Sequence, residues 1–207
     1  MEQLIALLQA ISPLSAALEA HLRRIIQETK YKKGDIILPL DAICNQIFYI
    51  ETGLVRSFYY AVEEPGVLAG EEVSNWFMKQ GDICIAVLSF LRRIPSYEIH
   101  VALEACLCWG ITHEQLEEIY VLFPEFNIHG RIITGEYYCQ SMERERDLKL
   151  KSAEERFALL MEKTPELALR VPNKYLASYM GVKERTLEKL RHDYSIKKNR
   201  PPGQKNG

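Results

Sequence analysis

The sequence of 207 residues predicts an α+β protein: an N-terminal β-roll or jelly roll, a long helix and a C-terminal, winged helix-turn-helix domain. Three observations predict this order. Short strand-like runs with glycine turns occupy about residues 31–107, a long helical run begins at Phe126, and a compact two-helix pattern begins at Asn173. Many short strands joined by glycine turns are typical of a β-sandwich or jelly-roll barrel.

The N-terminal segment, residues 1 to about 30, is predicted to be helical. Ser12 followed by Pro13 has the pattern of a helix N-cap with proline at the first helical position. Apolar side chains then recur at helical spacing, at Leu14, Leu18, Leu22, Ile25 and Ile26. The sequence therefore predicts an amphipathic helix that begins at Pro13.

The predicted strands of the roll are rich in β-branched and aromatic residues. They are Ile36–Leu38, Gln46–Ile50, Leu54–Tyr60, Asn75–Met78 and Ile99–Leu103. Glycine turns separate them at Lys33-Gly34-Asp35, Glu51-Thr52-Gly53 and Gln80-Gly81-Asp82. Residues 63–72, which contain Pro65-Gly66 and Gly70, are predicted to form a longer loop on the roll.

Helical periodicity returns at Thr112. Thr112 and Gln115 form a capping-box pattern, with Thr112 at the N-cap and Gln115 three residues later, so a helix is expected to about Leu122. A long helix is then expected from Phe126 to about Leu148. Ser152 is expected to cap a further helix that reaches about Lys163.

One face of the long helix has the spacing of a two-helix seam. Apolar or small residues alternate at steps of four and three, with Tyr138 beside them, at Ile128, Ile132, Gly135, Cys139 and Met142. Gly135 would let two backbones approach closely, although glycine weakens a helix by about 1 kcal/mol. The alternative is a helix that packs only on its own roll. We expect a dimer seam.

The segment from Asn173 to His192 has the pattern of a helix-turn-helix. Ala177 provides a small side chain where two short helices cross, and Gly181 can adopt the positive φ of a tight turn. The apolar residues that would close the small core are Leu176, Met180, Val182, Leu187 and Leu190. The alternative is an ordinary αα-hairpin with a charged outer face.

Charged and polar residues are left on the outer face of the second helix, where a recognition helix meets DNA bases. These candidates are Lys183, Glu184, Arg185, Thr186, Glu188, Lys189 and Arg191. Arg185 or Lys189 could donate hydrogen bonds to a guanine edge, and Glu184 or Glu188 could accept one from cytosine. Thr186 could bind a phosphate.

The charge distribution supports a phosphate-binding C-terminus. From Lys183 onward, eight Lys or Arg against three Asp or Glu give a net charge of +5, and the preceding residues carry −7 within the chain total of −2. A basic end on an acidic body is typical of a protein whose last segment meets nucleic acid.

Enzyme, metal and cofactor chemistry is not expected. The five cysteines are odd in number and scattered, so we interpret most of them as buried, reduced thiols. No His-x-His pair, nucleophile elbow or phosphate-binding glycine loop occurs in the sequence. No stretch approaches the roughly 20 apolar residues of a membrane span, and no signal-peptide pattern opens the chain, so we expect a cytoplasmic protein without membrane contact.

The order of elements resembles the Crp/Fnr family of bacterial transcription regulators, and within it the branch of Bacteroidetes-type bacteria. The resemblance covers about residues 10–195. The motifs that carry it are Tyr31-Lys32-Lys33-Gly34-Asp35, Ile50-Glu51-Thr52-Gly53-Leu54-Val55-Arg56, Pro95-Ser96-Tyr97-Glu98, Phe123-Pro124-Glu125-Phe126-Asn127, Arg131-Ile132-Ile133-Thr134, Lys151-Ser152-Ala153-Glu154-Glu155-Arg156 and Leu176-Ala177-Ser178-Tyr179-Met180-Gly181-Val182.

The resemblance implies a cyclic-nucleotide-binding-like effector domain in residues 1–122, a dimerisation helix in 123–150 and a helix-turn-helix domain with a basic tail in 151–207. It further implies a homodimer that binds a palindromic operator in double-stranded DNA, with RNA polymerase as a further partner. An effector in the roll would shift the DNA-binding domains through the long helices.

The chain departs from the family at the effector site. Ile85-Ala86 stands where members that bind cyclic AMP carry Gly-Glu, and Pro95-Ser96 replaces Arg-Ser, with Tyr97 beside it. The expected pocket is therefore degenerate and apolar, between Ile85, Val87, Leu88, Tyr97 and Ile99. Cyclic AMP is not expected to be the effector unless Arg92 or Arg93 replaces the missing phosphate clamp.

The recognition helix also departs from the family. Its start reads Lys183-Glu184-Arg185-Thr186 where family members often have Ser-Arg-Glu-Thr, so a different operator is expected. The wing is reduced, or lies between Pro165 and Pro172. The alternative function is a ligand sensor or adaptor whose helix-turn-helix no longer binds DNA.

Overall fold

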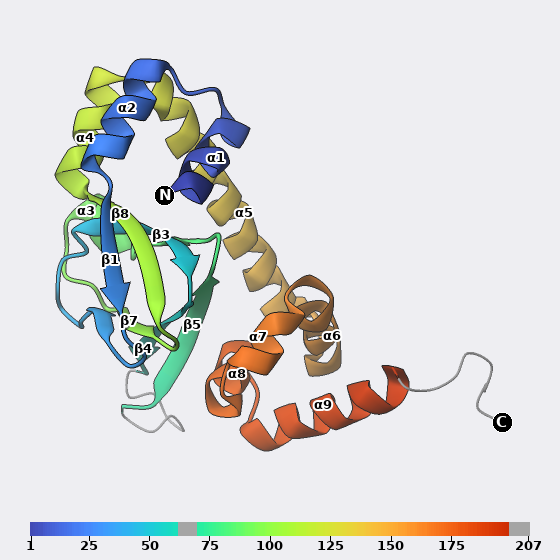
Figure 1. Cartoon of the computed structure of the whole chain (residues 1–207). Helices are drawn as coiled ribbons and strands as arrows, with labels where there is room; N and C mark the ends of the chain where they lie inside the picture. Colours follow the sequence, from blue (N-terminus) through green and yellow to red (C-terminus); the bar gives the residue numbers. More distant parts are fainter. Residues whose placement is uncertain (62–69, 199–207) are drawn as a thin grey trace. The chain divides into compact units, whose positions relative to one another are not determined.

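The computed structural model describes residues 1–61 and 70–198, which form two compact units (Figure 1). The first unit comprises Met1–Glu71 and Asn75–Cys139, and the second comprises Glu72–Ser74 and Gln140–Gly207, apart from residues 62–69 and 199–207. The division falls inside the long helix, so this helix belongs half to each unit. Most of the predicted loop at 63–72 lies outside the described residues.

The N-terminal segment forms two helices, α1 (Glu2–Ile11) and α2 (Ala16–Ile25), and not one helix that begins at Pro13. The Ser12 backbone is extended, and its N–H closes α1 by donating to Leu8 O at 3.1 Å. The true N-cap of α2 is Ser15, whose hydroxyl accepts from Leu18 N at 3.2 Å. The prediction at Ser12 is wrong because α1 buries its own apolar residues and uses Ser12 as its end.

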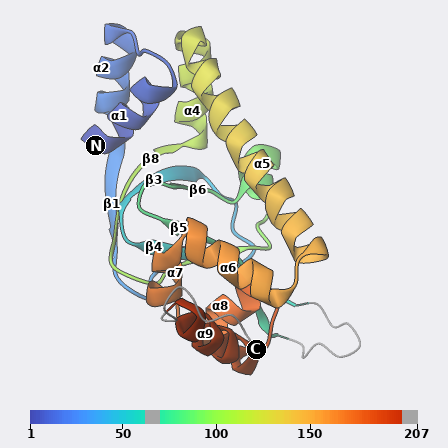
Figure 2. The same cartoon turned by 90° about the vertical axis from the view of Figure 1, so that its right-hand side faces the viewer.

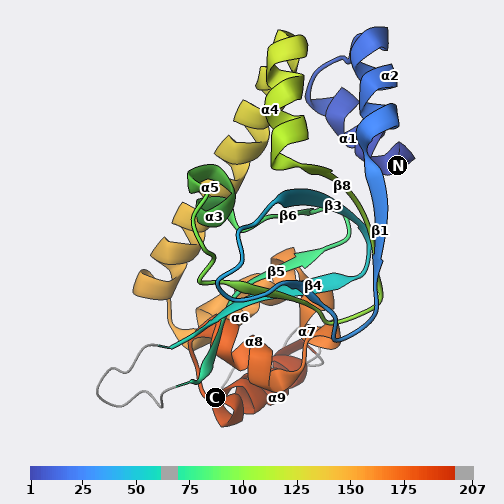
Figure 3. The ribbon, with the colours of Figure 1, turned by 90° about the vertical axis from the view of Figure 1, so that its left-hand side faces the viewer.

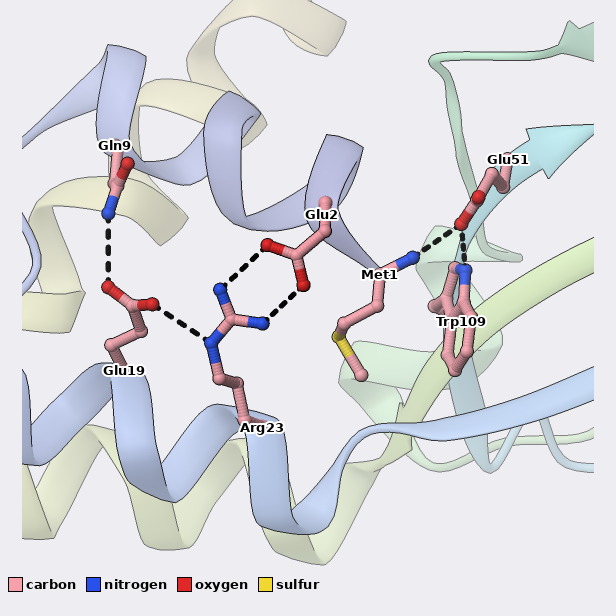
Figure 4. A network of polar contacts seen from close by, with 7 residues as sticks. All are labelled: Met1, Glu2, Gln9, Glu19, Arg23, Glu51 and Trp109. Atoms are coloured by element: carbon pink, nitrogen blue, oxygen red, sulfur yellow. Dashed lines mark hydrogen bonds and ion pairs between the residues drawn. The ribbon is translucent and has the colours of Figure 1, made fainter.

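Polar contacts bind α1 to α2 and to the roll (Figure 4). The guanidinium of Arg23, on α2, donates to both carboxylate oxygens of Glu2 at 2.5 and 2.9 Å, and to Glu19 at 2.9 Å. The Glu51 carboxylate accepts from the Met1 nitrogen and from the Trp109 indole N–H. The Arg23 ion pairs are exposed to solvent, which screens them, so we expect them to contribute little to stability.

The first unit is built on two antiparallel four-stranded sheets with strand orders β1-β8-β3-β6 and β2-β7-β4-β5 (Figures 2 and 3). The eight strands are β1 (Gln27–Tyr31), β2 (Ile36–Leu38), β3 (Gln46–Thr52), β4 (Leu54–Tyr60), β5 (Glu72–Lys79), β6 (Ile83–Cys84), β7 (Ile99–Ala102) and β8 (Cys106–Thr112). All five predicted strands are confirmed. The predicted helix to about residue 30 is wrong at its end, where Gln27–Tyr31 pairs along β8.

The core of the roll lies between these sheets. It consists of Phe48, Ile50, Val55, Met78, Cys84, Ala102, Cys106 and Cys108. Gly53 turns β3 into β4 with φ +111°, and a Cβ there would lie 2.5 Å from Cys106 Sγ. Four of the five cysteines are buried, as predicted, whereas Cys139 is exposed. The described residues contain no group of three or more His, Cys, Asp or Glu that could hold a metal ion.

The predicted helices after the roll are confirmed. Thr112 and Gln115 form the expected capping box of α4 (His113–Leu122). A short 3-10 turn, η1 (Pro124–Phe126), leads into α5 (Asn127–Leu150), and Ser152 caps α6 (Ala153–Lys163) in a second capping box. A further helix, α3 (Val87–Arg92), was not predicted.

The second unit continues with α7 (Pro165–Arg170), α8 (Asn173–Met180) and α9 (Glu184–Lys198). The alternative that a wing lies between Pro165 and Pro172 is wrong, because Pro165 starts a helix there. None of the helices within residues 1–61 and 70–198 has the length and apolar character needed to cross a membrane.

Candidate nucleic-acid interface

The turn between α8 and α9 has the geometry expected of a helix-turn-helix. Gly181 ends α8 in the left-handed region, at φ +64° and ψ 40°. Its N–H donates to Ser178 O at 3.0 Å, and Val182 N–H donates to Ala177 O at 3.0 Å. Most residues with a Cβ are strained in this conformation, so glycine is the residue that the turn requires.

A small apolar core holds the two helices together. Ala177 is only 2% exposed, as expected for a residue at the helix crossing. The predicted core residues Leu176, Met180, Leu187 and Leu190 are buried, and Val182 is half-buried. Phe157 and Leu160 from α6 and Leu167 from α7 are also buried in this unit.

The outer face of α9 is open to solvent at six of the seven predicted positions. These are Lys183, Glu184, Arg185, Thr186, Glu188 and Lys189. Arg191 is half-buried, and its Nε is buried without a hydrogen-bond partner among the described residues. Lys197 and Lys198 lie in the last turn of α9, whereas Arg200 and Lys205 fall outside the described residues.

Lys183 stands at the start of α9, where its carbonyl accepts from Thr186 N at 2.9 Å and from Leu187 N at 3.1 Å. A lysine side chain has no acceptor, so it cannot cap the first amides of the helix. Amides at a helix N-terminus favour an anion such as a DNA phosphate.

The predicted seam of α5 is exposed along its length. Ile132 and Met142 are 40% and 46% exposed, Ile128 and Cys139 are also exposed, and a Cβ on Gly135 would meet no atom within 4 Å. The first unit holds the other face of this helix. His129 Nε2 lies 3.1 Å from both Leu8 O and Ser12 O.

Tyr137 adds a second contact on that inner face, since its hydroxyl accepts from Ile83 N at 2.7 Å. Burial raises the pKa of Tyr137 to about 12, so the phenol stays protonated and also donates to Ile83 O at 3.4 Å. The inner face of α5 therefore packs on the first unit, and the predicted seam residues lie on another, exposed face of the same helix.

The residues predicted for the effector pocket differ in how far they are buried. Ala86 is buried at the N-cap of α3 and packs with Ile85 against Phe90. Pro95 is exposed, and Tyr97 is 51% exposed. Ser96 is buried, and its hydroxyl accepts from Glu98 N and donates to Glu98 O.

Arg93, one candidate for a replacement phosphate clamp, is already engaged. Its Nη1 donates to Cys44 O at 2.8 Å and to Phe90 O at 3.3 Å, and its Nη2 donates to Asn45 Oδ1. Arg92, the other candidate, is exposed on α3.

Polar side chains form a network beside β7. The Glu98 carboxylate accepts from Ser57 Oγ at 2.6 Å and lies 3.4 Å from His100 Nε2, while His100 Nδ1 lies 3.5 Å from Cys84 Sγ. We call these four residues the Glu98 network. Val87 and Leu88, which were expected in the lining, are exposed on α3 instead.

Proton positions in the Glu98 network follow from its geometry. Burial by itself raises the pKa of Glu98, but the hydrogen bonds from His100 and Ser57 outweigh burial and lower it. Burial holds the pKa of the Cys84 thiol well above its usual value. An anionic Glu98 carboxylate can accept from His100 Nε2–H, and the Cys84 thiol stays protonated.

Several solved structures are similar to this chain in fold, at low sequence identity. FixK2 from Bradyrhizobium japonicum is 18% identical with a TM-score of 0.71, covering 87% of this chain and 90% of that one. A protein from Eubacterium rectale, assigned to the transcriptional regulators of the Crp/Fnr family, is 17% identical with a TM-score of 0.67, covering 89% and 85%.

CLP from Xanthomonas campestris, described as a c-di-GMP responsive global regulator, is 14% identical with a TM-score of 0.65, covering 91% of this chain and 96% of that one. No family model matches the sequence, and neither does any curated protein. The chain therefore has the fold of Crp/Fnr-type regulators, with a β-roll, a long helix and a helix-turn-helix.

Proposed function

We propose that this protein is a sequence-specific DNA-binding transcription regulator that acts as a homodimer on a palindromic operator. The observation that carries the proposal is the outer face of α9, where six charged or polar side chains are exposed on a well-formed helix-turn-helix. The likeness to regulators in fold supports it.

Base recognition is assigned to the first turns of α9. Arg185 and Lys189 are four residues apart, so they project from the same side of the helix and can each reach a guanine edge. Glu184 and Glu188 repeat this spacing and can each accept from a cytosine amino group. Two adjacent rows, one basic and one acidic, favour a mixed G and C half-site, with Thr186 bonding a phosphate.

Dimerisation is assigned to the exposed seam of α5. Isolated exposed apolar residues need no explanation, but a row at four-three spacing has the pattern of a two-helix seam. Cys139 makes this testable, because the other four cysteines are buried. Mild oxidation of the full chain should yield a disulfide-linked dimer on a non-reducing gel, and Cys139→Ser should abolish it.

The effector site is proposed to be degenerate. Cyclic AMP carries a phosphate charge, whereas the roll presents the Glu98 carboxylate and has committed Arg93 to backbone carbonyls. We propose further that the protein acts in the cytoplasm with RNA polymerase as a partner, and that it is neither an enzyme nor attached to a membrane. The regulators that share its fold support this role.

Selection of bound sequences from a random DNA pool by the purified full chain tests the proposal. A palindromic consensus with two equal half-sites is the expected result. Recovery of unrelated sequences would contradict it and favour the alternative of a sensor or adaptor that no longer binds DNA.

A further inference from the structure

The C-terminal end of α8 must satisfy carbonyls that the helix itself cannot. The last four carbonyls of an α-helix lack intrahelical partners. Ala177 O and Ser178 O accept from the amides of the turn, at Val182 and Gly181. The other two, Tyr179 O and Met180 O, each accept from an arginine on another helix.

Arg144, on α5, makes the first of these contacts in two ways. Its Nη2 donates to Tyr179 O at 2.8 Å, and its Cζ lies 3.7 Å from the centroid of the Tyr179 ring. A planar guanidinium can stack on an aromatic ring and donate to a carbonyl at the same time, which an ammonium group cannot do as well.

Arg156, on α6, makes the second contact. Its Nε donates to Met180 O at 3.2 Å, and its Nη1 donates to Lys151 O at 2.5 Å. It therefore joins the end of α8 to the short connection between α5 and α6. Both guanidinium groups lie where the dipole of α8 favours positive charge. We call Arg144 and Arg156 the arginine clamp.

We propose that the arginine clamp positions the recognition helix and thereby sets the spacing between operator half-sites. The proposal rests on the proposed function. Because α9 starts at Glu184, four residues after α8 ends, a clamp on that end also fixes the start of α9. The clamp ties this turn to the part of α5 that carries the seam residue Met142, two residues before Arg144.

The clamp is expected to affect the spacing between half-sites and not the bases that each half-site prefers. In a two-fold dimer, the separation of the recognition helices follows from how each is held on its own dimerisation helix, and half-site spacing mirrors that separation. The side chains proposed for base recognition lie on α9 and are not part of the clamp. Loss of the clamp should leave half-site preference intact while it relaxes the spacing requirement.

The test compares the full-length protein with its Arg144→Ala and Arg156→Ala variants. Arg146→Ala is the matched control, because Arg146 is exposed on the same helix as Arg144 and pairs with its neighbour Asp147 at 3.4 Å. Fluorescence anisotropy measures binding to the selected operator, to operators with one or two base pairs added or removed at the centre, and to half-site sequence variants.

Wild type and Arg146→Ala should require one spacing. Arg144→Ala and Arg156→Ala should each bind the best operator about tenfold more weakly and discriminate less between spacings, with unchanged half-site preference. A clamp variant that keeps the wild-type spacing requirement overturns the proposal. So does a variant that loses half-site preference as well, because the role would then be general folding of the domain.

Hydrogen exchange provides a readout that needs no DNA. The amides of Gly181 and Val182 should exchange faster in both clamp variants than in Arg146→Ala. Equal exchange in all three overturns the positioning role. If wild type selects no DNA sequence, the proposed function fails and with it the spacing claim, whereas the exchange data still decide whether the clamp holds the turn.

Discussion

The roll interior and the outer face of α9 contain the same kinds of side chain under opposite conditions. In the roll, the Glu98 carboxylate is held by Ser57 and His100 of its own chain. On α9, Glu184, Glu188 and Lys189 are exposed. Polar groups already satisfied within a chain must lose those bonds before they bind a ligand, whereas exposed groups lose only water. The difference favours recognition at α9 over ligand binding near Glu98.

The largest effect of a single substitution is expected at the seam of α5. Its residues are exposed in the single chain and are proposed to be buried in the dimer. Ile132→Glu should dissociate the dimer, since it would bury a charge between two helices at a cost of several kcal/mol. Sedimentation velocity should show a monomer with a folded roll. Thr134→Glu adds the same charge at an exposed position outside the seam and should remain dimeric. A dimeric Ile132→Glu protein would place the interface elsewhere.

Stability should respond differently to the same substitution in the two regions. Glu98→Ala removes the acceptor of two buried groups, so it should lower the free energy of unfolding of the first unit by about 1–3 kcal/mol. Glu188→Ala, at an exposed site, should change stability by less than about 0.5 kcal/mol. Denaturant titrations measure both. Equal losses of unfolding free energy in the two variants would mean that the Glu98 network does not stabilise the first unit.

The Glu98 contribution should also depend on pH. A carboxyl whose pKa is lowered on folding stabilises the protein above its unfolded value, and this stabilisation is lost as pH falls through the folded value. The gap between wild type and Glu98→Ala should therefore be full at neutral pH and shrink in acid, below the ordinary carboxyl range. A gap that is constant with pH would contradict an ionised Glu98.

Substitutions on the outer face of α9 should alter DNA binding without altering the free energy of unfolding. Arg185→Ala and Lys189→Ala should each cost about 1–3 kcal/mol of operator binding and relax the preference at one base pair. Lys163→Ala is the control, because this exposed lysine lies on α6, outside α9, and pairs with Glu143. Binding assays with base-substituted operators provide the measurement. Wild-type affinity in both α9 variants would remove the recognition assignment.

The smallest expected effect is that of cyclic nucleotides on the roll. The family resemblance predicts the loss of two charge-assisted contacts, worth about 1.5–3 kcal/mol each, at Ala86 and Pro95, which should weaken binding by about 10²-fold or more. Titration calorimetry with cyclic AMP and cyclic GMP should detect no saturable binding in the low micromolar range. Saturation there, with a matching gain in DNA affinity, would instead assign the phosphate to Arg92.

Features fixed by local sequence were predictable. Ala177 and Gly181 are informative because helix crossing and positive φ restrict the residue type at single positions. The Thr112–Gln115 capping box and the cap at Ser152 were predictable for the same reason, since a side chain and an amide three residues away determine them. The exposed side chains of α9 follow from helical periodicity once the buried positions are known.

Features that depend on distant pairing were not predictable. Gln27–Tyr31 is polar and forms a strand because β8 pairs along it. The Glu98 network depends on the register that places Ser57 opposite His100 across β4 and β7. Alternation of Glu98 and His100 on one face of a strand was the available signal, but it does not reveal the opposite strand. The carbonyl partners of Arg144 and Arg156 likewise need the fold.

At position 135, the single chain and the proposed dimer favour different residues. An alanine there would fit without contact in the single chain and would favour the helix by about 1 kcal/mol. In a seam, the added methyl would hold two backbones apart. Selection for stability of the single chain would therefore favour alanine at position 135, whereas selection for the proposed dimer would favour glycine.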